Sequence, residues 1–242
     1  MAGHSKWSNI KHRKGAQDAK RGKIFTKLIK EITISSRIGG GDQSSNPRLR
    51  KAVSKAKASN LALDKIERAI KKGTGELEGV VYEEIIYEGY GPSGVSIILE
   101  IITDNKNRSV AEIRHLLTKY GGNLGENGSV MWMFEKKGII ILDAECGTEE
   151  DIMDLVIECG AQDFKNEDGF YTIDTDPDQI TKISEMINKA GFELVSSEVE
   201  LIPKTLQIVK KAESDPVIRL LDELDDNDDV NRLYTNFKIA ID

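Results

Sequence analysis

The sequence has few of the residues from which disulfide frameworks, metal sites and membrane spans are built. Its 242 residues include two cysteines and three histidines. Cys146 and Cys159 are too few for a disulfide framework or a four-ligand zinc site, and His4, His12 and His115 are too scattered for an H-E-x-x-H metal helix. No stretch approaches the ~20 apolar residues of a membrane span, and no apolar signal core follows the first residues. We therefore expect a cytoplasmic protein with reduced thiols, no metal and no membrane contact.

Motifs for nucleotide binding and for nucleophilic catalysis are also missing. There is no G-x-S-x-G elbow, and the loop GGNLGENGS lacks the Gly-Lys-Ser/Thr ending of a P-loop. Gly89, Gly91 and Gly94 have the G-x-G-x-x-G spacing, but Pro92 lies among them and a β-branched segment follows where a helix is required, so we interpret them as a hairpin turn. We expect no enzyme and no cofactor. An enzyme acting in an inter-domain cleft is the less favoured alternative, since no carboxylate pair stands out among the many acids.

Charge is distributed unevenly along the chain. The whole sequence has 34 Lys+Arg and 41 Asp+Glu, a formal net charge of −7. Residues 1–75 alone carry a net charge of +14, and the remaining residues carry −21. Such asymmetry indicates a basic arm joined to an acidic body.

Three short amphipathic helices are predicted in the basic arm after an extended segment at residues 3–15. The first covers residues 16–36 and has an apolar face at helical spacing, and a row of lysines lies within about 80° on its opposite face. Asn46 and Pro47 begin the second helix as its cap and first-turn proline. The third covers residues 63–72 and is expected to end at Gly73. The apolar face of the first helix consists of Ile24, Phe25, Leu28, Ile29 and Ile32, and the lysine row of Lys20, Lys23, Lys27 and Lys30.

The lysine row is interpreted as a surface for a polyanion. A solvated helix face normally mixes signs and gains from Glu-to-Lys pairs four residues apart, whereas acids are scarce here. Contact with nucleic acid or with the ribosome is therefore favoured over a plain solubilising face. An anionic membrane is least favoured, because the bulky apolar side chains that membrane docking requires are needed for the core.

Alternating and helical patterns predict an α/β architecture for the acidic body. Two strands form a hairpin around residues 89–94, a helix follows to about Tyr120, and a second hairpin is expected to turn at Lys136, Lys137 and Gly138. From residue 138 the order β-α-β-β-α-β indicates a ferredoxin-like unit. Residues 206–209, a helix at 216–224 and a strand at 233–239 would complete a second α/β unit that the ferredoxin-like one interrupts.

The predicted fold class is therefore α+β and multi-domain. We expect a basic helical domain at residues 1–78, a discontinuous α/β domain at residues 79–134 plus 204–242, and a ferredoxin-like domain at residues 135–203. The ferredoxin-like domain is not expected to bind RNA, since Phe164, Phe170 and Tyr171 lie among acids that repel phosphate. The acidic run at residues 225–229 lacks the Gly and Glu positions of an EF-hand and is predicted to be a solvated turn.

Four blocks of the sequence resemble the YebC/PmpR family, and the resemblance extends over essentially the full length. It implies three domains, a helical one followed by two α/β domains, one inserted in the other. Bacterial members are described as transcriptional regulators that bind DNA, and mitochondrial relatives as translational activators. The blocks are MAGHSKWSNIKHRKGAQDAKRGKIFTKLIKEI, NPRLRKAVSKAKASNLALDKIERAIKKGTG, YEGYGPSGVSIILE and TDNKNRSVAEIRHLLTKYGGNLGENGSVMWMF.

Two functions follow as expectations, and both place nucleic acid on the basic arm. The first is a DNA-binding regulator of transcription, and the alternative is a translation factor that binds the ribosome and its RNA. Basic side chains would contact phosphates, which positions a protein without specifying sequence, and Trp7 would stack on bases. A protein partner is expected for the acidic body. The residues predicted to bind nucleic acid are Lys6, Trp7, Lys11, His12, Arg13, Lys14, Lys20, Arg21, Lys23, Lys27, Lys30, Arg48, Arg50, Lys51 and Lys55.

Overall fold

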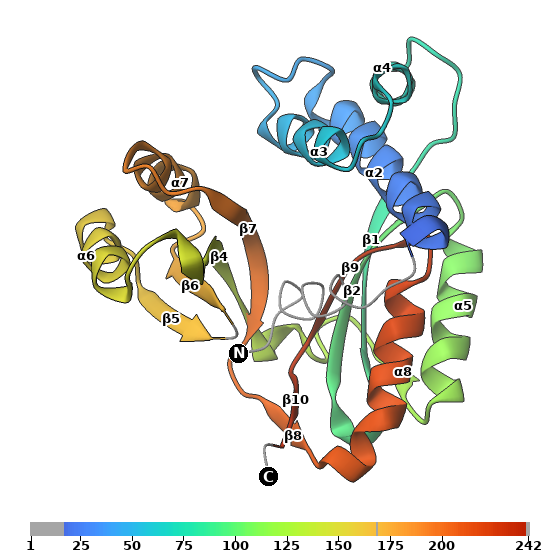
Figure 1. Ribbon diagram of the computed structural model, residues 1–242. Coiled ribbons are helices and arrows are strands. Elements are labelled where there is room, and N and C mark those ends of the chain that lie inside the picture. The colour runs from blue at the N-terminus through green and yellow to red at the C-terminus, as the bar shows by residue number, and fades with distance from the viewer. Residues whose placement is uncertain (1–16, 168, 241–242) are drawn as a thin grey trace. The chain divides into compact units, whose positions relative to one another are not determined.

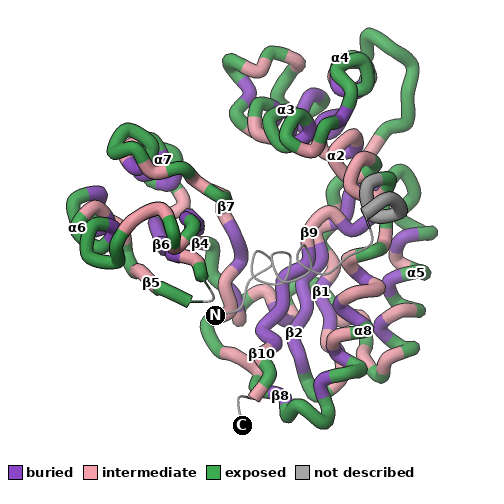
Figure 2. Tube along the Cα trace, in the orientation of Figure 1, coloured by how far each residue is buried: buried purple, intermediate pink, exposed green. Residues whose placement is uncertain are grey.

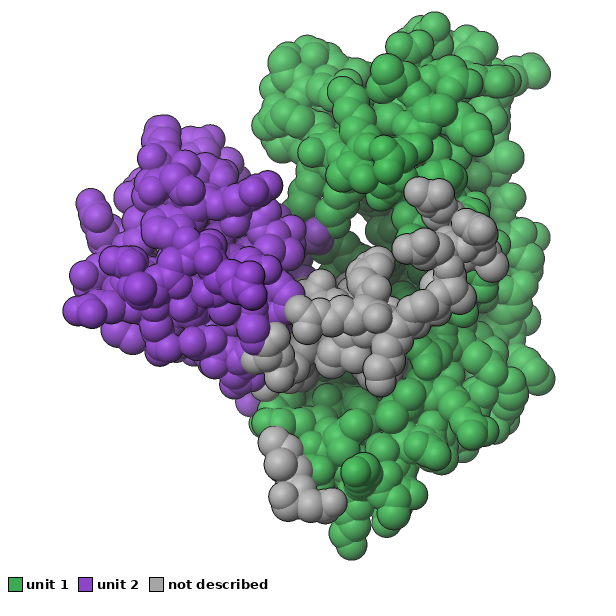
Figure 3. Space-filling model, viewed as in Figure 1, with its two compact units in different colours: residues 1–132, 205–242 green, residues 133–204 purple. Residues whose placement is uncertain are grey.

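The structure is a computed structural model that describes residues 17–167 and 169–240 (Figure 1). It divides into two compact units, residues 1–132 with 205–242, and residues 133–204 (Figure 3). The basic helices therefore belong to the same compact unit as the discontinuous α/β part. The finer division into three domains with boundaries near residues 78, 134 and 204 stays a prediction.

The helical region consists of α2 (Gln17–Gly39), α3 (Pro47–Ala58) and α4 (Leu63–Thr74). Asn46 caps α3 as expected, because its side-chain oxygen accepts a hydrogen bond from the Leu49 amide at 3.0 Å. Gly73 does not end the third helix as predicted, since it lies inside α4 and the left-handed cap is Gly75. A Cβ at Gly73 would lie 2.3 Å from the Thr33 carbonyl oxygen, so this glycine allows α4 to approach α2 closely. The small core contains Ile32, Leu49, Ala52, Val53, Ala56, Leu61, Ile66 and Ala69.

The α/β part of the first unit is a four-stranded sheet, and two helices pack side by side against it. The sheet order is β3-β1-β2-β9, from β1 (Glu83–Tyr90), β2 (Ser96–Thr103), β3 (Asn123–Leu124) and β9 (Val230–Thr235). Helices α5 (Lys106–Lys119) and α8 (Ser214–Asp225) lie side by side against it, and the buried residues follow β2 and the inner sides of both helices (Figures 1 and 2). The last described strand, β10 (Phe237–Ile239), pairs with β8 (Gln207–Val209) in parallel.

The second unit has the predicted ferredoxin-like topology. Its order is β4 (Phe134–Asp143), α6 (Glu149–Cys159), β5 (Asp163–Glu167), β6 (Phe170–Thr175), α7 (Ile180–Lys189) and β7 (Leu194–Pro203). The strands are antiparallel in the order β5-β6-β4-β7. Because this unit lies between residues 132 and 205 of the other, the α+β class with one α/β part inserted in another is confirmed.

One strand of this unit corrects the sequence prediction. Residues 136–138 are not a hairpin turn, because β4 runs without interruption from Phe134 to Asp143. Gly138 is required for a different reason: a Cβ there would lie 2.2 Å from the Thr175 hydroxyl and 3.0 Å from Ile180. Phe164 and Tyr171 stack at 5.4 Å between ring centroids and pack in the core under the helices.

Candidate nucleic-acid interface

The predicted nucleic-acid residues fall into three groups by their place in the structure. Lys6, Trp7, Lys11, His12, Arg13 and Lys14 lie outside the described residues. Lys20 and Arg21 lie at the start of α2, where the described part does not include their side chains. The side chains of the other predicted residues are described and lie on α2 and α3: Lys23, Lys27, Lys30, Arg48, Arg50, Lys51 and Lys55.

The described lysines of the α2 row contact the acidic run at the end of α8. Lys23 Nζ lies 3.0 Å from the carbonyl oxygen of Asp226, and Lys27 Nζ lies 2.5 Å from that of Asp225. Their carboxylates are each 3.7 Å from the same nitrogens. The carbonyls at the end of a helix lack partners within the helix and carry the negative end of its dipole, so lysines stabilise this end of α8.

Lys30 reaches deeper than the other two lysines. Its Nζ donates to the carbonyl of Asp228 at 2.8 Å and to the carboxylate of Asp229 at 2.6 Å. The acidic run at residues 225–229 contains a turn with Asp226 and Asp228 exposed, but it is not merely solvated as we predicted, because it forms the surface on which α2 docks. This correction follows from contacts between residues about two hundred positions apart in the chain.

Asp229 lies at the centre of a buried polar network. Its second carboxylate oxygen accepts hydrogen bonds from Ser109 at 2.6 Å, Arg108 at 2.9 Å and Thr103 at 3.1 Å. Burial alone would raise the pKa of Asp229, but the hydrogen bonds from Lys30, Ser109 and Arg108 outweigh it and lower the pKa to about 2. The carboxylate is therefore ionised at neutral pH and links α2, β2, α5 and β9.

Arg48 is also engaged within the protein. Its guanidinium binds the Glu31 carboxylate through two hydrogen bonds of 2.7 and 3.0 Å, and it contacts Glu84 of β1. Burial raises the pKa of Glu31, but the hydrogen bonds and charge of Arg48, the charge of Arg232 and the hydrogen bond from Ser35 together lower it below its usual value. Arg50 donates to the backbone carbonyls of Gln43 and Ser44. Arg48 therefore joins α3 to α2 and to the sheet.

Basic side chains that are exposed gather on α3 and α4. Residues 47–74 contain nine Lys+Arg and two acids, Asp64 and Glu67. Sequence reasoning missed the contribution of α4, although the helical spacing of Ile66 and Ala69 on the buried side was a usable signal for its exposed side. Lys51 is half-buried, whereas the exposed bases are Arg50, Lys55, Lys57, Lys65, Arg68, Lys71 and Lys72.

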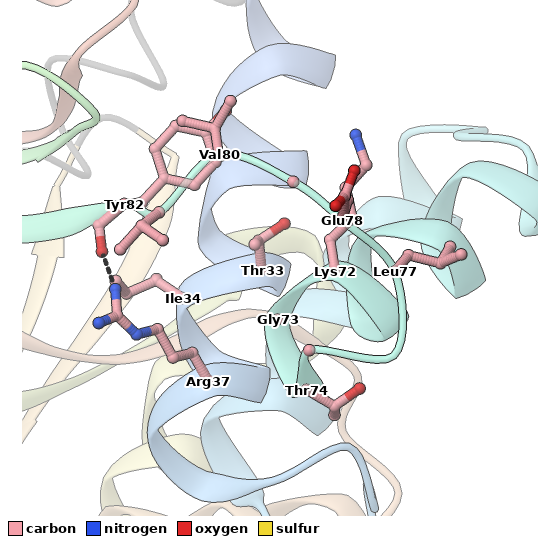
Figure 4. Close-up of a pocket in the computed structure, with 13 residues that line it drawn as sticks. Thr33, Ile34, Arg37, Lys72, Gly73, Thr74, Leu77, Glu78, Val80 and Tyr82 are labelled. Carbon is pink, nitrogen blue, oxygen red and sulfur yellow. Dashed lines mark hydrogen bonds between the residues drawn. The ribbon is translucent and has the colours of Figure 1, made fainter.

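A groove lies where the end of α4 meets α2 (Figure 4). It has a volume of about 830 Å³, and Arg37, Lys72 and the linker from Gly75 to Tyr82 line it. Arg37 donates to the Tyr82 carbonyl at 2.8 Å and so holds the linker against α2. The groove joins one edge of the basic surface, where Lys72 is exposed, to the linker that leads into β1.

The described residues contain no cluster of three metal-binding side chains and no helix long and apolar enough to cross a membrane. Cys146 and Cys159 are free thiols in the second unit, and burial raises the pKa of both.

Fold and surface together define a multi-domain α+β protein with a basic N-terminal helical region. The family model described as TACO1/YebC protein N-terminal domain matches residues 5–76, and the model described as TACO1/YebC second and third domain matches residues 82–237. The chain belongs to the TACO1/YebC family. The resemblance seen in the sequence is confirmed.

Relatives match over nearly their whole length. A protein of Geobacter sulfurreducens named probable transcriptional regulatory protein is 54% identical over 99% of this chain and 97% of its own. A protein of Desulforapulum autotrophicum with the same descriptive name is 53% identical, with the same coverage. The crystal structure of a conserved hypothetical protein, Aq1575, of Aquifex aeolicus has a TM-score of 0.85 at 42% identity and covers 93% of each chain.

Proposed function

We propose that this protein regulates transcription by binding DNA through the exposed basic side chains of α3 and α4. The observation that carries the proposal is the excess of nine bases over two acids in residues 47–74, with most of these bases exposed. The names of the bacterial relatives support the regulatory role. The described lysines of α2, which sequence reasoning placed first, contribute less in this conformation because they contact α8.

Binding of this kind uses the phosphate backbone. Each lysine or arginine that neutralises a phosphate releases a condensed counterion, so affinity falls steeply with salt. The sequences of α3 and α4, PRLRKAVSKAKA and LDKIERAIKKGT, contain no Asn or Gln. Adenine is normally recognised by Asn or Gln in the major groove and guanine by Arg or Lys, so these helices lack adenine-reading side chains, and in this proposal their bases contact phosphates and position the protein.

The test is removal of charge from the exposed surface. The variant K57Q/K65Q/R68Q/K71Q changes four exposed residues, and K136Q/K182Q/K189Q/K204Q removes the same charge from exposed lysines of the second unit. Binding of a fluorescent duplex would be measured over a salt series. We expect the slope of log affinity against log salt to flatten by up to about 3 to 4 in the first variant and to stay unchanged in the second. Equal behaviour of the two variants would refute the proposed site.

A ribosome-associated function is the second candidate, and the same observation favours it. A surface of lysine and arginine without Asn or Gln suits the backbone of ribosomal RNA as well as that of duplex DNA. The purified protein would be offered fluorescent genomic duplex together with unlabelled ribosomes across the salt series. Displacement of the duplex by ribosomes at physiological salt would favour the translation factor, and retention of the duplex would favour the transcriptional regulator.

A further inference from the structure

The acidic run at the end of α8 occupies lysines that a polyanion could otherwise use. We propose that this run, residues 225–229, is a built-in competitor that limits nucleic-acid binding by Lys23 and Lys27 until phosphates displace it. The inference rests on the proposed function, since it concerns the same ligand. It assigns to the acidic run a regulatory role in addition to its role in docking α2.

The chemistry of the contact resembles that of a phosphate backbone. Lys23, Lys27 and Lys30 are spaced four and three residues apart, so they form one row about 10 Å long on α2. Lys23 and Lys27 donate to the backbone carbonyls of Asp226 and Asp225, whose carboxylates lie 3.7 Å away, and Lys30 donates to the carboxylate of Asp229. A strand of nucleic acid also presents a row of anionic oxygens, and the same ammonium groups can bind only one of the two at a time.

Burial decreases along the row from Lys30 to Lys23. Exchange of the ion pair therefore costs less free energy at the Lys23 end than at the Lys30 end. The side chains of Lys30 and Asp229 are 10% and 5% exposed, those of Lys27 and Asp225 are 18% and 22%, and those of Lys23 and Asp226 are 44% and 47%. Exposed ion pairs contribute about 0 to 1 kcal/mol, whereas removing one partner of a buried pair is costly. Lys23, at the exposed end, therefore exchanges partners most readily, Lys27 does so at a higher cost, and Lys30 keeps α2 in place.

Negative charge around the outer ion pairs disfavours binding of a single anion. Asp104 and Glu112 line the same pocket as Lys23 and the acidic run. Asn227 donates to Glu112 at 3.0 Å, which holds the run against α5. Only a ligand with several phosphates in a row compensates for this local negative charge, so a single phosphate or nucleotide is not expected to displace the run.

The experiment removes the two outer carboxylates. The variant D225N/D226N is compared with E213Q/D215N, which removes the same charge from exposed residues at the opposite end of α8. We expect D225N/D226N to bind duplex or ribosomal RNA about 3- to 10-fold more tightly than this control, with a salt slope steeper by about 1 to 2. Adding K23Q/K27Q to D225N/D226N should abolish the gain.

The outcomes separate this inference from the proposed function. If the wild-type protein binds and D225N/D226N binds no better than E213Q/D215N, the acidic run is only a docking surface and the inference is wrong, while the proposed function stands. If wild type and variants all fail to bind nucleic acid, the proposed function is wrong and the inference is wrong with it. Thermal unfolding of each variant checks the fold. The single change D226N, at the half-exposed end, provides the same comparison should the double variant unfold.

Discussion

Replacing Asp229 by asparagine tests the network that joins α2 to the α/β part. The pKa of this carboxyl is lowered from 3.8 to about 2, which corresponds to about 2 kcal/mol of stabilisation at neutral pH. The asparagine amide would also direct donors toward Ser109 and Arg108, which are themselves donors. We expect D229N to lower the free energy of unfolding by about 3 kcal/mol at pH 7. An exposed control, D215N, should change it by less than about 0.5 kcal/mol.

The pH dependence distinguishes a charge effect from a packing effect. Because the folded-state pKa of Asp229 lies below the unfolded one, its stabilisation is complete above about pH 5 and is lost as the pH falls from about 4 toward 2. Urea unfolding of wild type and D229N, followed by circular dichroism from about pH 7 to about pH 3, should show the difference between them narrowing at low pH. Hydrogen exchange of residues 28–36 would localise the effect to α2. A difference that is independent of pH, or below about 1 kcal/mol at pH 7, would refute the assignment.

Three further predictions concern close approaches and buried charges. G73A should lower the melting temperature, because the alanine Cβ would lie 2.3 Å from the Thr33 carbonyl oxygen and overpacking costs about 1 to 3 kcal/mol of stability. G22A, whose Cβ would meet nothing within 4 Å, should instead raise the free energy of unfolding by about 0.5 to 1 kcal/mol. E88Q should speed hydrogen exchange at residues 125–131, since the Glu88 carboxylate accepts the amides of Gly128, Val130 and Met131 at 2.6 to 2.8 Å; unchanged exchange would contradict this. R48M should destabilise the protein by about 1 to 3 kcal/mol through the loss of the Glu31 pair, while K57M should be neutral in the same thermal melts.

Local signals predicted most elements of this fold. Asn46 followed by Pro47 defines the start of α3 because capping and a fixed φ act within a few residues. Alternating and helical periods reproduced the ferredoxin-like order because each element buries one face against its neighbours. These effects depend on short stretches of chain, so a single sequence carries them.

The sequence predictions are wrong where the role of a residue depends on packing against an element that is distant in the sequence. Gly138 was interpreted as a turn, yet it makes room for Thr175 and Ile180. Gly73 was interpreted as a helix end, yet it makes room for the backbone of α2. Sequence shows that a glycine is present, but whether it serves a turn or a close approach depends on what packs against it.

The candidate surface was only partly predictable for the same reason. Helical spacing placed Lys23, Lys27 and Lys30 on one side of α2, and the structure agrees. Helical spacing could not show that the acidic run, about two hundred residues later in the sequence, contacts that side of α2. The exposed bases of α4 were available from spacing alone, but the lysine row of α2 had the stronger pattern.

Charge asymmetry along a sequence is therefore not the same as charge asymmetry on a surface. Residues 1–75 carry +14, but Lys23, Lys27 and Lys30 are bound by acids of residues 225–229, and Arg48 is shared by Glu31 and Glu84. Part of the positive charge thus stabilises the fold by holding the basic helices to the acidic α/β part. The exposed basic side chains that the structure describes in residues 22–75 lie mainly on α3 and α4. Under the competitor proposal, release of the Lys23 and Lys27 pairs would add basic surface without adding a residue.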